Sequence, residues 1–138
     1  MKKIISIFLI ASNLLFGKVF YNLENAINYA TQVKKPILLF IYSPTCPHCS
    51  NYFYQVKSNR RILAYIARNY VVCMLSVNKT QIPPNIDFTG LVPYTDILFF
   101  NGKQIAPSIK GEIPMNYLYE YLLQGNILFQ KILQKFYY

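Results

Sequence analysis

The chain has 138 residues, which is enough for one domain and too few for two. Hydrophobic residues make up 54% of the sequence and charged residues 14%, which excludes a disordered chain because there is ample apolar surface to bury. The formal net charge is +9, but beyond the first three residues the longest basic runs are the pairs Lys34-Lys35 and Arg60-Arg61. Such dispersed charge argues against nucleic acid as a partner.

The amino end has the features of a secretory signal peptide. Lys2 and Lys3 precede an apolar run from Ile4 to Phe16, which as a helix would be about 20 Å long, short of the ~30 Å core of a bilayer. We therefore predict a signal peptide over residues 1–17 and export to the periplasm. Two alternatives stay open because the residue three positions before the expected cut is larger than usual: an uncleaved anchor in the inner membrane, and an ordinary buried element.

The first predicted elements of the mature domain, residues 18–125, are a helix and a buried strand. Asn22 can cap a helix that begins at Leu23. Lys34-Lys35-Pro36 ends this helix, because the residue before a proline avoids the helical region. Residues 37–42 form a continuous apolar run, which predicts a central strand covered on both faces.

A turn, two helices and a second strand are predicted next. Ser43-Pro44-Thr45 turns the chain, and a helix begins at Pro47, where a missing N–H costs nothing. Ser58 is expected to cap the following helix, whose apolar residues up to Ala67 recur at helical spacing. Residues 70–77 are rich in β-branched and apolar side chains, which indicates a second buried strand.

A loop and a hairpin are predicted after this strand. Residues 78–90 lack periodicity and contain two adjacent prolines, which is typical of a loop. Asn101-Gly102 separates residues 94–100 from residues 103–109. This dipeptide predicts a hairpin because it favours the positive φ that a tight turn needs.

The carboxyl end predicts two helices separated by a glycine. Pro114 is expected to begin the first helix and Gly125 to interrupt it. Residues 126–138 would then form an amphipathic helix packed on its own domain, with a dimer or membrane-surface contact as the alternatives. The full order is helix, strand, two helices, strand, hairpin and helix, which predicts an α/β fold of three layers with a mixed sheet between helices.

The pattern Cys46-Pro47-His48-Cys49 falls where the first predicted strand gives way to a helix, and there it is a redox motif. The free N–H groups and the positive dipole end of the helix stabilise a thiolate on Cys46, the form that attacks a disulfide. Cys49 lies one turn on and can resolve the mixed disulfide, so we expect a Cys46–Cys49 disulfide, which can persist outside the cytoplasm. His48 can donate to the sulfur or place positive charge near it; the alternative is a surface imidazole with no electrostatic role.

Two segments resemble the thioredoxin superfamily. Residues 35–49 are similar to its apolar strand running into Cys-x-x-Cys, and residues 90–103 are similar to its cis-proline strand and hairpin. The Pro-His dipeptide resembles that of bacterial periplasmic disulfide oxidases, whereas the compact chain looks more like small exported thioredoxin-like proteins. The resemblance implies a thioredoxin-like fold and a thiol–disulfide oxidoreductase that acts on protein thiols and disulfides without a cofactor. It also implies a membrane or periplasmic redox partner.

The resemblance further implies a strand that binds substrate. Pro93 matches the family's cis-proline, and Val92 would offer backbone groups to an extended substrate by strand addition. Tyr94, which follows Pro93, is the third expected substrate-binding residue. A trans proline at the start of an edge strand is the alternative.

The sequence departs from the family pattern at two positions, and a third position bears on one of these departures. Phe40 stands where the family's reductants often carry a buried acid, and Thr45 replaces a tryptophan that is common before the first cysteine. Asp96 could substitute for the missing acid, but a solvated aspartate at a hairpin edge is expected. The direction of exchange, oxidant or reductant, therefore stays open.

Cys73 falls in an apolar run, so a buried and inert thiol is expected, with a third redox centre as the alternative. A metal is not expected, because adjacent His48 and Cys49 are awkward ligands for one tetrahedral site. Two functions of other classes stay open: a binding or chaperone module that uses the fold without turnover, and a metal-delivery protein.

Overall fold

The computed structural model describes residues 17–79 and 82–137. The predicted signal peptide therefore lies, except for Gly17, outside the described residues.

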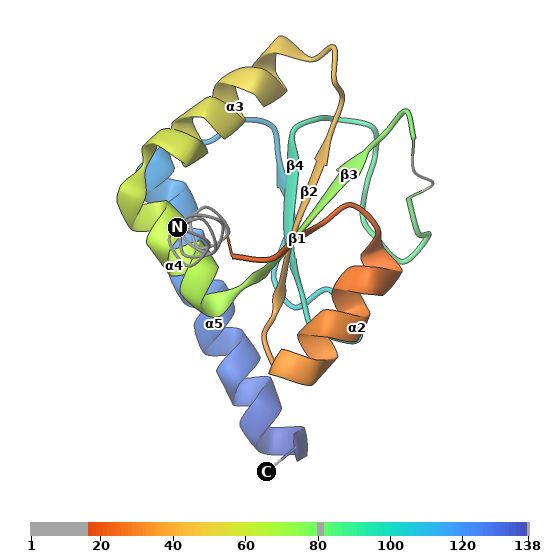
Figure 1. The fold of residues 1–138 in the computed structure, drawn as a ribbon, viewed down its shortest axis with the longest axis vertical. Helices are drawn as coiled ribbons and strands as arrows, with labels where there is room; N and C mark the ends of the chain where they lie inside the picture. The colour runs from red at the N-terminus through yellow and green to blue at the C-terminus, as the bar shows by residue number, and fades with distance from the viewer. Residues whose placement is uncertain (1–16, 80–81, 138) are drawn as a thin grey trace, which may run out of the picture.

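A five-stranded mixed sheet forms the middle layer of the fold (Figure 1). The strands are β1 (Val19–Phe20), β2 (Ile37–Tyr42), β3 (Val71–Ser76), β4 (Tyr94–Leu98) and β5 (Ile109–Lys110), and their order across the sheet is β1-β3-β2-β4-β5. β3 runs parallel to β1 and β2, whereas β4 runs antiparallel to β2 and β5. β2 is thus the central strand, as its continuous apolar sequence predicts.

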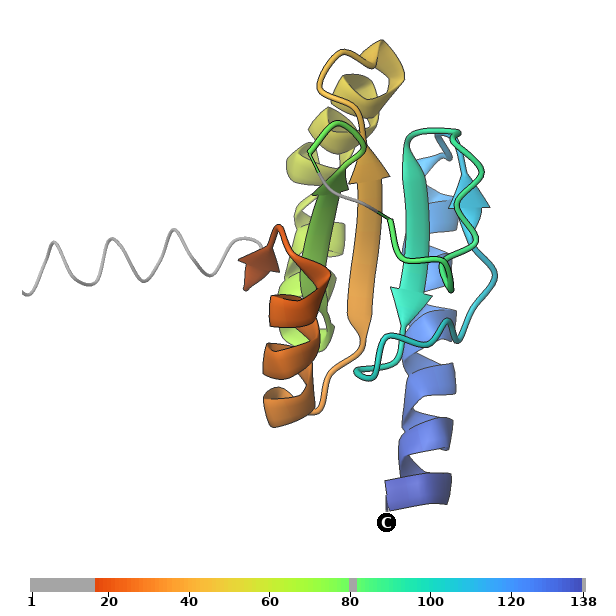
Figure 2. The ribbon, with the colours of Figure 1, turned by 90° about the vertical axis from the view of Figure 1, so that its right-hand side faces the viewer.

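Helices cover both faces of the sheet. α2 (Leu23–Val33) lies on one face, and α3 (Pro47–Ser58) and α4 (Arg60–Asn69) lie on the other (Figures 1 and 2). α2 begins where the Asn22 side chain accepts a hydrogen bond from the Asn25 N–H, and it ends at Lys34 in the left-handed region. The three-layer arrangement predicted from the sequence is confirmed.

The core consists of two clusters, one on each face of β2. Leu39 and Ile41 pack into the cluster beneath α2, whereas Leu38 and Phe40 pack into the cluster beneath α3 and α4. This alternation follows from the two-residue period of a strand, and it fixes the register of β2 against both neighbours.

α5 (Met115–Tyr137) is one continuous helix, so the predicted interruption at Gly125 and the separate helix over residues 126–138 are wrong. Gly125 is buried, and a Cβ atom there would collide with Ile97 and lie 2.9 Å from the Tyr70 hydroxyl. The glycine therefore lets the helix approach the sheet closely. None of the described helices is both long and apolar enough to cross a membrane.

Two further predictions need correction. Ser58 does not cap α4: it is the last residue of α3, and its hydroxyl donates to the Tyr54 carbonyl, while Asn59 caps α4 by accepting from the Ile62 N–H. The predicted hairpin forms only in part. After the turn, its returning arm makes one isolated bridge, between Leu98 and Gln104, before β5 pairs with the start of β4.

Candidate active site

The cysteine motif lies at the carboxyl end of the central strand, where β2 leads into α3 (Figure 1). The Cys46 N–H donates to the Ser43 carbonyl, which closes the turn, and Cys46 is the N-cap residue of α3. Pro47 occupies the first turn of the helix, where its missing N–H leaves no bond unmade. The first turn of α3 carries no acidic residue, so its positive dipole end is not neutralised within the helix.

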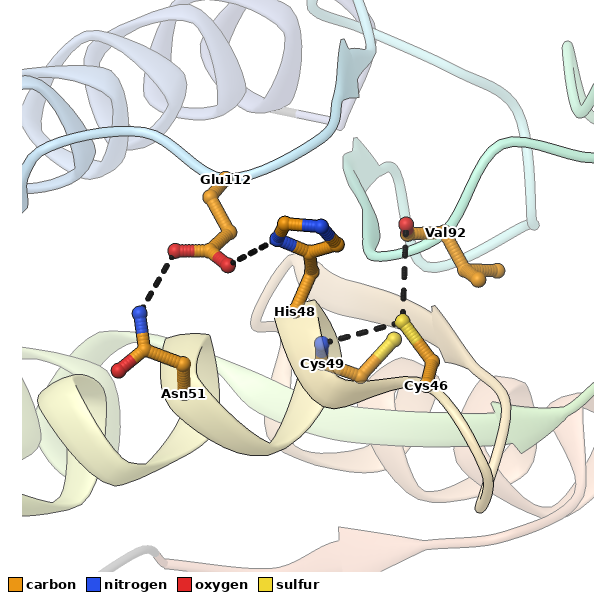
Figure 3. A network of polar contacts seen from close by, with 6 residues as sticks. All are labelled: Cys46, His48, Cys49, Asn51, Val92 and Glu112. Atoms are coloured by element: carbon orange, nitrogen blue, oxygen red, sulfur yellow. Dashed lines mark hydrogen bonds and ion pairs between the residues drawn. The ribbon is translucent and has the colours of Figure 1, made fainter.

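The two cysteine side chains face each other across this first turn (Figure 3). The Cys49 N–H donates to Cys46 Sγ over 3.2 Å, and Cys46 Sγ also lies 3.9 Å from the Val92 carbonyl oxygen. Both cysteines are free thiols here; Cys46 is half-buried, whereas Cys49 is only 2% exposed. The arrangement combines a reachable sulfur, held at a helix N-terminus, with a second sulfur shielded behind it.

Burial is the main cause that separates Cys49 from an ordinary thiol. It is the largest of the causes that raise the pKa of Cys49 to about 11, and the hydrogen bond to Cys46 acts in the same direction. The Cys49 thiol is therefore protonated near neutral pH, and it must lose this proton before it can act as a nucleophile.

The strand beside the cysteines begins at a cis peptide bond between Val92 and Pro93. The Val92 carbonyl faces Cys46 (Figure 3). The Pro93 carbonyl accepts a hydrogen bond of 2.8 Å from the Gly111 N–H. Tyr94 is different, because its side chain is fully buried in the core and its hydroxyl donates to Asp96. Of the three sequence-predicted substrate residues, Val92 and Pro93 thus lie beside the motif, while the Tyr94 side chain points away from it.

His48 contacts a residue that sequence reasoning missed. Its Nδ1 atom lies 2.9 Å from Glu112 Oε1, and the Asn51 amide donates to Glu112 Oε2, also over 2.9 Å (Figure 3). The imidazole is thus bonded to a carboxylate, and not to the Cys46 sulfur as the sequence suggested. Glu112 is 64 positions away in the chain, and its only sequence signal is the scarcity of acids, with five Asp and Glu residues in all.

Residues 19–102, more than half of the chain, match the protein family described as Thioredoxin-like. The chain belongs to this family. No curated protein sequence matches it.

Solved structures support the thioredoxin-like fold. A thioredoxin from Thermus thermophilus superposes with a TM-score of 0.62 at 16% identity, covering 78% of this chain and 85% of that one. A thioredoxin-fold protein from Helicobacter pylori gives 0.61 at 14% identity, covering 86% and 81%. A structure described as DsbH oxidoreductase gives 0.58 at 16% identity, covering 80% and 88%. At these identities the likeness establishes the fold.

Asp96 of this thioredoxin-like protein is buried, so the prediction of a solvated aspartate is wrong. The residue is 0% exposed in β4, where its carboxylate accepts from the Tyr94 hydroxyl over 2.7 Å and from the Ile97 N–H over 2.9 Å. Burial raises the pKa of Asp96 to about 6, although these hydrogen bonds oppose the change. The bonds to Tyr94 and Ile97 lie within its own strand and satisfy the carboxyl group where it is buried.

The remaining predicted features are the third cysteine and the metal ligands. Cys73 is 0% exposed in β3, within the cluster beneath α2, and burial raises its pKa to about 12. This confirms that Cys73 is a buried thiol. Among residues 17–79 and 82–137, no three His, Cys, Asp or Glu side chains gather as a metal site would require.

Proposed function

We propose that this thioredoxin-like protein is an exported oxidoreductase that exchanges disulfides with protein substrates through Cys46 and Cys49. One observation carries the proposal: a half-buried sulfur at the N-terminus of α3 accepts an N–H bond, and a second, shielded cysteine lies one turn behind it. The helix terminus and the N–H donor both stabilise a thiolate on Cys46. Membership of a family built on this fold agrees with that chemistry.

In the reducing direction the reaction has two exchange steps. The Cys46 thiolate attacks one sulfur of a substrate disulfide, which forms a mixed disulfide and releases the other substrate sulfur as a thiolate. Cys49 then loses its proton and attacks Cys46 Sγ, which forms the Cys46–Cys49 disulfide and releases the second substrate thiolate. Two electrons pass from the dithiol to the substrate, and the oxidising direction is the reverse.

The substrate would lie along Val92 and Pro93. The Val92 carbonyl is beside the attacking sulfur, so an extended substrate segment bonded to that backbone would have its disulfide next to Cys46. In this proposal export rests on the amino-terminal segment, and a membrane or periplasmic redox partner would restore the dithiol or the disulfide after each cycle. A reduction potential near roughly −120 mV would make the protein an oxidant, and one near roughly −270 mV a reductant.

The insulin-reduction assay with dithiothreitol tests the proposed activity, and Cys46→Ser is the variant that matters. We expect it to lose catalysis, because a serine hydroxyl does not form a mixed disulfide. Cys73→Ala is the matched control: it removes a thiol that is 0% exposed, and it should retain wild-type activity. Full activity in Cys46→Ser would contradict the proposal. Cellular function retained by this variant would instead favour the binding module.

A further inference from the structure

We propose that Glu112 is a positioning residue that holds His48 away from the Cys46 sulfur and thereby lowers the reduction potential of the Cys46–Cys49 pair. The inference rests on the proposed function, and it concerns the balance between the two oxidation states.

Glu112 accepts hydrogen bonds from two neighbouring donors on α3. A carboxylate has two acceptor oxygens and no donor. One oxygen meets His48 Nδ1 and the other meets the Asn51 amide, each over 2.9 Å, so one carboxylate satisfies two donors of α3 (Figure 3). Because the carboxylate is acceptor-only, Nδ1 must carry the proton in this contact, and it is not available to the sulfur.

The position of Glu112 ties α3 to the segment, just before β4, that carries Val92. Gly111, immediately before it, donates its N–H to the Pro93 carbonyl over 2.8 Å. The same short segment therefore contacts both walls of the site, the helix through Glu112 and the strand through Gly111. Glu112 is 25% exposed whereas His48 is 79% exposed, so the carboxylate is the more enclosed partner of this contact.

The sign of the effect follows from charge. A thiolate is present in the reduced form and absent from the disulfide, so every group that stabilises the thiolate raises the reduction potential. Glu112 acts against the thiolate in two ways: it occupies the imidazole Nδ1, and it places a negative charge near the motif. That same charge is among the causes that raise the pKa of Cys49.

The alternative is that His48 and Glu112 form a surface ion pair that has no effect on the redox chemistry. Exposed pairs of this kind contribute little to folding stability, so a stability measurement would not separate the two possibilities. A reduction potential does separate them, because a merely structural contact would leave it unchanged.

The test is a glutathione redox titration of wild type, Glu112→Gln, His48→Ala and the double variant. Glutamine keeps the size of the side chain but removes its charge and one acceptor oxygen. We expect Glu112→Gln to shift the equilibrium at least fivefold towards the reduced form, which corresponds to a rise of about 20 mV in potential. In the His48→Ala background the same substitution should shift it less than twofold, since only the direct effect of the Glu112 charge then remains.

Glu120→Gln is the matched control, because it removes one negative charge from α5, where Glu120 contacts Gln124. It should shift the equilibrium less than twofold. The inference is overturned if Glu112→Gln shifts the equilibrium less than twofold, lowers the potential, or acts equally with and without His48.

The wild-type titration distinguishes a failure of the proposed function from a failure of the inference about Glu112. A wild type that forms no Cys46–Cys49 disulfide would overturn the proposed function together with this inference. A wild type that exchanges normally, beside a Glu112→Gln variant of unchanged potential, would overturn the inference alone.

Discussion

At the scale of single residues, the three cysteines differ in burial, and burial decides what each thiol can do. Cys46 is half-buried at a helix N-terminus, Cys49 is 2% exposed, and Cys73 is 0% exposed among apolar side chains. Burial in low-dielectric surroundings disfavours the charged thiolate, so the pKa values of Cys49 and Cys73 rise to about 11 and about 12. One chain thus holds one reachable sulfur and two protected ones.

This difference predicts the order in which iodoacetamide modifies the reduced protein at pH 7.5. Cys46 should react first, at least tenfold faster than Cys49, because Cys49 is shielded and protonated at this pH. Cys73 should react only when the protein unfolds. Peptide mapping by mass spectrometry after timed quenching measures the three rates, and equal labelling of Cys46 and Cys73 in the folded protein would contradict the assignment.

Asp96 predicts a distinct pH dependence of stability. Its pKa is about 6 in the folded protein against an ordinary 3.8, so between about pH 4 and pH 6 the folded state keeps a proton that the unfolded state has lost. The free energy of unfolding must then fall as pH rises through this window, by up to about 3 kcal/mol. In Asp96→Asn this contribution disappears. Urea unfolding of both proteins at several pH values tests this, and parallel pH profiles would refute it.

The residues of the site fall into two groups: those that a local sequence motif predicts and those that only the tertiary structure reveals. Cys46, Pro47 and Cys49 were predictable because a short motif fixes their place on a helix. Glu112 was not, since its contact with His48 spans 64 positions and depends on tertiary structure. The burial of Asp96 was missed for a related reason: a charged residue in a β-run is usually solvated, and its partner Tyr94 becomes visible only in the folded strand.

At the scale of elements, the strand and helix of the motif followed from sequence, whereas α5 did not. Propensity correctly marks Gly125 as a poor helix residue, but the packing of the helix against β4 overrides it. The glycine is required for the close approach to Ile97 and Tyr70, a contact that no local pattern encodes.

Gly125→Ala should therefore destabilise the protein, although alanine is the better helix former. The new methyl group meets Ile97, which is 0% exposed, and the Tyr70 hydroxyl, which is fixed by a bond of 2.6 Å to the Leu122 carbonyl. Overpacking of this kind costs about 1–3 kcal/mol. Gln130→Ala, at an exposed position of the same helix, is the control and should change the free energy of unfolding by less than about 0.5 kcal/mol. A Gly125→Ala protein more stable than wild type would contradict this.

At the scale of the whole molecule, α5 joins the two clusters of the core. Leu118 and Leu122 belong to the cluster beneath α3 and α4, whereas Phe129 and Leu133 belong to the cluster beneath α2. The three-layer fold was predictable from the order of the elements. This bridging was not, because an amphipathic pattern shows that a helix has an apolar face without showing which layer covers it.

The bridging role predicts a large cost for truncating Phe129, which is 0% exposed and packs against the rings of Phe99 and Phe100. Phe129→Ala should lower the free energy of unfolding by about 3–5 kcal/mol. Phe136→Ala removes an equal ring that is 69% exposed from the same helix, and it should cost under about 1 kcal/mol. A loss from Phe129→Ala as small as the loss from Phe136→Ala in denaturant unfolding would show that Phe129 does not join α5 to the core.

The central claim is that Cys46 attacks a disulfide and that Cys49 resolves the mixed disulfide. It is tested most directly by reacting the reduced protein with oxidised glutathione and measuring the masses of the products by mass spectrometry. The wild type should end with a disulfide between Cys46 and Cys49 and no glutathione attached. Cys49→Ala should stop at a stable glutathione adduct on Cys46. An adduct on Cys49 or Cys73, or a wild type that retains glutathione on Cys46, would contradict the account.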